Sequence, residues 1–151
     1  MSTIAMTGED TVMINGRIFA DLADVDAVAL TFPNDIANVK TGKNGNSMYG
    51  LNETGKQSEV MIRVVRGSSD DKFMNNLLSQ QQNNFAGFPL LVGEFTKKIG
   101  DGTGAIQRDT YIMSGGIFQR MVDAKMNVEG DTEQSVSIYR LKFANNPRAI
   151  G

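Results

Sequence analysis

The chain has 151 residues, of which 40% are hydrophobic, and it carries a formal net charge of −2 with neither Cys nor His. This composition is ordinary for a single folded domain, here residues 1–151, with a modest core. The lack of Cys and His excludes disulfides, thiolate nucleophiles, Cys/His metal sites and the usual acid–base residue of physiological pH. We therefore expect no catalytic residue, no metal and no cofactor.

Five segments organise the first 66 residues. Alternating apolar side chains predict strands over Thr11–Phe19 and Val25–Phe32, and a third extended stretch covers Ile36–Thr41. Gly42–Lys56 is rich in Gly, Asn and Lys, and a connection of that length is usually a functional arm or a disordered segment. Glu59–Arg66 then predicts a strand with apolar groups on both of its faces, so both faces need cover.

One helix is predicted over about 69–82. Ser68 or Ser69 offers an N-cap, and Asp70 and Asp71 lie in the first turn, where the helix dipole favours negative charge. Apolar residues recur at helical spacing and predict a stripe that faces a sheet: Phe73, Met74, Leu77 and Leu78. Neighbouring helical side chains point about 100° apart, so Asp70 and Asp71 are not a convergent pair of catalytic carboxylates.

The rest of the chain predicts more strands: Leu90–Ile99, Ile106–Ser114, Ile117–Val128 and Gln134–Phe143. Gly115–Gly116 indicates a bend or bulge after the second of these, and Pro147 indicates an irregular tail without strand pairing. About eight strands, one helix and hairpin-length connections favour a mainly β fold. We expect an antiparallel β-barrel or sandwich with one flanking α-helix and a long extended loop at about 42–56.

Two features of the loop invite a functional interpretation. Gly50–Gln57 satisfies the spacing of a phosphate-binding loop, but Gln57 stands where Ser or Thr should bind magnesium, and a strand pattern follows instead of a helix. We interpret it as a loop with Gly for backbone freedom. Met48 and Tyr49 are an apolar pair in a polar loop, which indicates either docking onto a partner or a loop that folds back on its own barrel.

Several blocks of sequence resemble one family. They are Lys40–Asn46, Gly55–Lys56, Val64–Lys72, Phe85–Leu90 and Asn127–Ser135. With them, the chain from about Val12 to Ile150 resembles the tail tube proteins of bacteriophages with contractile tails, which are similar in fold to the ring protein of type VI secretion. The resemblance implies hexameric rings that stack into a tube, whose joined sheets enclose a channel that conducts DNA.

The resemblance also implies partners and a location. The partners are further copies of the chain, the tail sheath protein, the tape-measure protein, and the baseplate and tail terminator proteins. Double-stranded DNA passes transiently and without sequence specificity, and no membrane insertion is expected. The location is the tail of the virion, assembled in the host cytoplasm. Edge strands that pair between copies would also remove the edges that invite aggregation.

Three groups of residues are candidates for these contacts. For contact between subunits or rings we expect Lys43, Asn44, Asn46, Met48, Tyr49, Leu51 and Lys56. For the channel lining we expect Asp123, Lys125 and Asn127, and a lumen without net positive charge that lets DNA slide. For the sheath contact we expect the polar side of the helix: Asp71, Lys72, Asn75 and Asn76. Two alternatives stay open: a type VI-like inner tube protein, and a monomeric β-barrel that binds a small ligand.

Overall fold

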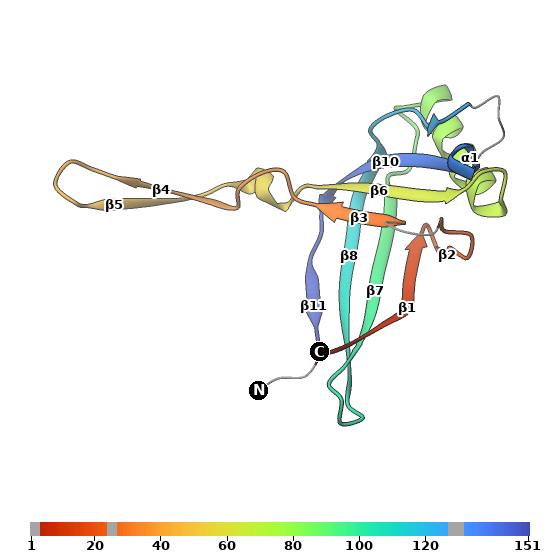
Figure 1. Ribbon diagram of the computed structural model, residues 1–151. Coiled ribbons are helices and arrows are strands. Elements are labelled where there is room, and N and C mark those ends of the chain that lie inside the picture. Colours follow the sequence, from red (N-terminus) through yellow and green to blue (C-terminus); the bar gives the residue numbers. More distant parts are fainter. Residues whose placement is uncertain (1–3, 24–26, 127–131) are drawn as a thin grey trace.

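The computed structural model describes residues 4–23, 27–126 and 132–151, and it is mainly β with one α-helix (Figure 1). The strands are β1 (Ala5–Ile14), β2 (Arg17–Ile18), β3 (Val28–Thr31), β4 (Ala37–Thr41), β5 (Ser47–Leu51), β6 (Ser58–Val65), β7 (Leu91–Gly100), β8 (Ile106–Phe118), β9 (Asp123–Ala124), β10 (Val136–Asn145) and β11 (Arg148–Ile150). The helix is α1 (Ser69–Asn83), and short 3₁₀ helices cover Glu53–Lys56 and Thr132–Ser135. The expected fold class is confirmed, although the sheet of the described residues does not close into a barrel.

One large antiparallel sheet organises the body of the molecule. Its order is β2-β1-β7-β8-β10-β6-β3, with β11 added to β8 and β9 added to β10. In Figure 1, β3, β6 and β10 run across the view while β1, β7, β8 and β11 run down it, so the sheet bends over on itself. β2 and β3 lie at its two edges. β4 and β5 form a separate two-stranded sheet.

The core fills the concave side of the bent sheet, and α1 contributes to it. Strands and helix share one cluster of buried side chains, which includes Ile14, Val60, Ile62, Val64, Met74, Leu78, Leu91, Met113, Tyr139, Leu141 and Phe143. In β6 every second residue is buried, as period-2 alternation requires. Met74 and Leu78 are the buried part of the predicted helical stripe, and Phe73 and Leu77 pack beside them.

The helix was predicted well because its signals are local. Ser68 is the N-cap, and its hydroxyl accepts a hydrogen bond from the Asp71 amide at 3.3 Å. The helix ends one residue beyond the predicted boundary, at Asn83. The strands predicted over Glu59–Arg66 and Gln134–Phe143 are also confirmed, as β6 and β10.

Two glycine signals had different outcomes. The strand expected over Thr11–Phe19 is a hairpin, because Asn15 and Gly16 take φ of 50° and 83° and turn the chain between β1 and β2. By contrast, the bend or bulge predicted at Gly115–Gly116 is confirmed, because the register of β7 against β8 shifts there, and β8 continues beyond it to Phe118. The strand bends there, and the Phe143 ring occupies the space where a Gly116 Cβ would lie, 2.4 Å from its nearest ring atom.

Two C-terminal predictions were wrong. The long strand expected over Ile117–Val128 is reduced to β9, and residues 127–131 lie outside the described residues. β9 pairs with the first part of β10, at Ser137 and Ile138, and β8 pairs with its last part, from Leu141 to Asn145. The chain between β8 and β9 therefore leaves the sheet. The tail does pair, because Pro147 lacks only its own N–H. Its carbonyl accepts a hydrogen bond from Ile112 at 3.0 Å, and β11 pairs with β8.

Candidate interaction surfaces

The loop expected at about 42–56 is an ordered arm. Residues 36–52, which we call the arm, form the β4–β5 hairpin and project well away from the body (Figure 1). Every residue from 31 to 51 is exposed, so the arm does not fold back on its own body. The exposed fractions reach 74% at Met48, 83% at Tyr49 and 77% at Leu51. A lone two-stranded hairpin is marginal in water, which favours a bound state for the arm.

The two faces of the arm differ in chemistry. Cross-strand partners point to the same side, and β4 pairs Ala37 with Leu51, Val39 with Tyr49 and Lys40 with Met48. Val39, Tyr49 and Leu51 therefore share one apolar face, whereas Lys40 and Met48 point to the opposite face. Met48 and Tyr49, adjacent in sequence, therefore point to opposite faces of the arm.

The base of the arm is fixed to the body. Gly55 is buried, and a Cβ there would lie 2.6 Å from the Asp35 carbonyl oxygen. The Asn146 amide donates to the Lys56 carbonyl at 2.7 Å and accepts from the Ser58 hydroxyl at 2.7 Å. Gly50–Gln57 is thus a strand end and a single 3₁₀ turn that leads into β6, not a phosphate-binding loop that opens a helix.

The remaining contact candidates of the loop lie on or beside the arm. Lys43, Asn44 and Asn46 form its exposed tip, where the Gly42 amide bonds to the Asn46 carbonyl at 2.7 Å. Lys56 lies at the base and pairs with Glu53 at 3.0 Å. The structure therefore separates the predicted set into a tip, an apolar face, an opposite face and a base.

A second surface is the side of the β3–β6–β10 sheet that points away from the core. Its register places ten side chains there, and Asp123 of β9 joins them. We call this set the open face: Ala29, Thr31, Glu59, Met61, Arg63, Val65, Val136, Ile138, Arg140, Lys142 and Asp123. Most of these side chains are half-buried by their neighbours, whereas the opposite side of β6 is fully buried.

The open face is basic. Together with Arg120 and Lys125 at its margin it carries five basic and two acidic side chains, although the whole chain has a net charge of −2. Arg140 forms an ion pair with Asp123. The Arg63 Nε is buried and has no hydrogen-bond partner within the described residues. Asp123 and Lys125 were expected as channel-lining residues, and the third of that set, Asn127, lies outside the described residues. The arginines beside them were not predicted, because the strand pairing that brings them together is long-range.

The helix candidates divide into two groups. Lys72, Asn75 and Asn76 are exposed. Asp71 is instead turned toward the sheet, where its carboxylate accepts a hydrogen bond from the Tyr139 hydroxyl at 2.6 Å. Burial, together with this carboxylate, raises the pKa of the Tyr139 phenol well above its ordinary value.

The acidic side chains and the helix complete the survey of the part of the chain that the structure describes. Its Asp and Glu residues do not gather into groups of three or more that could hold a metal ion. No helix there has the length and apolarity that a bilayer crossing requires.

Comparison with known proteins gives a likeness of fold. No protein-family model and no curated protein sequence matches the chain. Among solved structures, the chain is similar to the sheath/tube terminator of PVC, an extracellular contractile injection system, in its extended state. The match covers 95% of this chain and 94% of that chain, with a TM-score of 0.54 and 8% sequence identity. At this identity the likeness concerns the fold.

Proposed function

We propose that this chain is a structural, non-enzymatic subunit of the tube of a contractile tail or related injection system. Copies form stacked hexameric rings around a channel that conducts DNA. The fold it shares with a sheath/tube terminator over nearly its whole length supports this role. The observation that carries the proposal is the arm, a hairpin whose apolar face has nothing to cover it within the described chain.

The arm makes the contact between copies, through its apolar face. A fully buried aliphatic or aromatic side chain contributes about 1.5–3 kcal/mol, so Val39, Tyr49 and Leu51 together favour a contact by several kcal/mol. An exposed apolar face that nothing covers is rare on a monomer and marks a site of association. In a ring, a head-to-tail contact of this kind closes by symmetry.

The other surfaces complete the assignment. The open face turns toward the channel, with Asp123 and Lys125 at it, and the exposed side of α1 turns toward the sheath. Asn127, the third residue expected to line the channel, lies outside the described residues. The partners are then the sheath and tape-measure proteins, and the baseplate and terminator proteins at the tube ends. The particle is the tail of a virion, assembled in the host cytoplasm.

The test compares two double variants of the arm. Tyr49→Ser with Leu51→Ser alters the apolar face, and Lys40→Ser with Met48→Ser alters the opposite face of the same two strands. By negative-stain microscopy and size exclusion, we expect the wild type and the second variant to assemble, and the first to remain a folded monomer. Equal assembly of both variants would refute the contact, and a wild type that stays monomeric at high concentration would refute the tube.

A second candidate is a terminator, favoured by the role printed for the similar structure. A tube subunit polymerises alone into long tubes, whereas a terminator gives single rings that do not stack. The same micrographs separate these outcomes from a monomeric ligand-binding protein. A type VI-like inner tube would also polymerise.

A further inference from the structure

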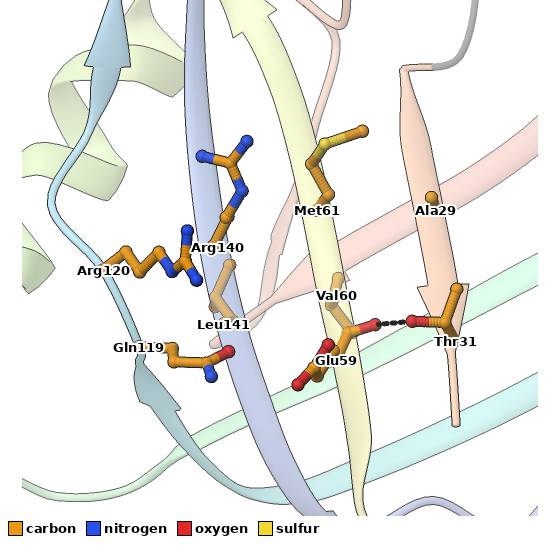
Figure 2. Close-up of a pocket in the computed structure, with 9 residues that line it drawn as sticks. All are labelled: Ala29, Thr31, Glu59, Val60, Met61, Gln119, Arg120, Arg140 and Leu141. Atoms are coloured by element: carbon orange, nitrogen blue, oxygen red, sulfur yellow. Dashed lines mark hydrogen bonds between the residues drawn. The ribbon is translucent and has the colours of Figure 1, made fainter. Parts of the chain in front are cut away.

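The open face contains a shallow groove that follows β6 and β10. One hollow of about 350 Å³ is lined by residues of β3, β6 and β10 and by Gln119 and Arg120 (Figure 2). A second hollow of about 360 Å³ is lined by Arg63, Ile138 and neighbouring residues of β9 and β10. Since Arg63 and Met61 are two residues apart on β6, the hollows lie end to end along the same strands. The groove thus suits an elongated ligand.

Its lining combines an apolar floor with a guanidinium rim. In Figure 2, Met61 on β6 lies between Arg120 and Arg140 on one side and Ala29 and Thr31 of β3 on the other, whereas Val60 and Leu141 are buried in the core. Arg120 and Lys142 form no ion pair within the described residues, and the Arg63 Nε is unpartnered. Arginine beside Met and aliphatic residues is the composition of protein–protein contacts.

We propose that the open face binds an acidic, amphipathic polypeptide. Carboxylates of the partner pair with Arg63 and Arg120, since guanidinium groups bind carboxylates in a bidentate manner. Apolar side chains of the partner enter the two hollows and cover Met61 and Ile138. This binding needs one copy of the chain and does not depend on ring formation.

Two other occupants fit less well. The arm of a second copy carries Lys40 and Lys43 and no acidic residue between positions 36 and 52, so it would be repelled by a basic face. A DNA backbone would match the charge, but phosphates and sugars offer little apolar surface to the floor of the groove.

The test uses three probes in fluorescence anisotropy titrations with the full chain. The first is a labelled 20-residue helical peptide of Glu and Leu with all Leu on one face. The second has Lys in place of Glu, and the third is a 20-base-pair duplex. We expect the Glu–Leu peptide to bind, the Lys–Leu peptide not to bind, and the duplex to bind at least ~10-fold more weakly, since its affinity must come from phosphate contacts alone.

Variants locate the site. Arg63→Gln with Arg120→Gln should weaken binding of the Glu–Leu peptide at least ~10-fold, and Met61→Ser should weaken it ~3-fold or more. Lys40→Gln with Lys43→Gln removes the same charge from the arm and should leave binding unchanged. Equal weakening by both charge variants, no effect of Met61→Ser, tighter binding of the duplex, or no binding of the Glu–Leu peptide would each overturn the proposal.

Discussion

Asp70 is the residue whose replacement tests the packing of α1 most directly. Its side chain is fully buried in the first turn of the helix. One carboxylate oxygen accepts from the Arg17 Nε at 2.9 Å, and the other accepts from the backbone amides of Ala20 and Asp21 at 2.8 and 2.7 Å. The residue therefore joins the helix N-terminus to the loop after β2. Asp70→Ala removes all three hydrogen bonds at once.

The free energy of unfolding that Asp70→Ala costs depends on the groups that lose a hydrogen-bond partner. The part-buried backbone amides of Ala20 and Asp21 lose a charged acceptor, at about 1–2 kcal/mol each. Arg17 is 36% exposed, so its guanidinium turns to water and adds at most about 1 kcal/mol. The expected loss of unfolding free energy is about 2–5 kcal/mol, a large part of the 5–15 kcal/mol typical of a whole domain. A purely local role, as negative charge at a helix N-terminus, would be worth about 0.3–1 kcal/mol.

Urea unfolding followed by circular dichroism measures this loss. It should be run at two protein concentrations, because self-association would add concentration-dependent stability. Arg17→Met and the double variant complete a cycle that isolates the ion pair, for which we expect a coupling near 1 kcal/mol. If Asp70→Ala costs less than 1 kcal/mol, the hydrogen bonds to the loop do not contribute as argued and only the charge at the helix end remains.

Three further predictions concern single contacts. Tyr139→Phe removes the hydrogen bond to Asp71 and should lower the free energy of unfolding by about 1.5–2 kcal/mol. Because the fold raises the pKa of the phenol, the free energy of unfolding of the wild type should fall as pH rises above about 10. This fall should be smaller in the variant. Arg148 lowers the pKa of Asp109, so their ion pair stabilises the fold at pH values above the ordinary carboxyl range, and this stabilisation is lost as pH falls below that range. Amide exchange should then show that β11 loses protection below about pH 4. Gly55→Val should displace the arm base and abolish assembly in micrographs, while circular dichroism of the body stays unchanged.

The sequence predicted what depends on neighbours along the chain. The N-cap at Ser68, the helical stripe and the alternation of β6 are local patterns, and each is confirmed. The sequence did not predict the features that depend on which distant segments of the chain pair with one another. β5 was interpreted as part of a loop because Gly42–Lys56 is rich in Gly, Asn and Lys, yet every residue of β5 pairs with β4. Asp70 was explained by the helix dipole alone, since its partners lie about 50 residues earlier in the chain.

The same dependence on long-range strand pairing explains why the charge of the open face was not predicted. Two apolar faces on Glu59–Arg66 predicted that one would meet something other than the core, but not that β10 would bring Arg140 and Lys142 beside it. The channel was expected to lack net positive charge. Asp123, one of its expected lining residues, lies on the open face, which together with Arg120 and Lys125 at its margin holds five basic and two acidic side chains.

This charge constrains the proposed channel. A basic wall attracts phosphates, and the attraction grows with each ring that the duplex passes, so bare open faces would slow DNA rather than release it. An acidic polypeptide seated on these faces would neutralise the arginines before DNA enters. If the open face lines the channel, passage of DNA therefore requires either such an occupant or high salt. In reconstituted tubes, Arg63→Gln with Arg120→Gln should then speed duplex passage at low salt and have little effect at high salt, and an equal effect at both would place the open face away from the channel.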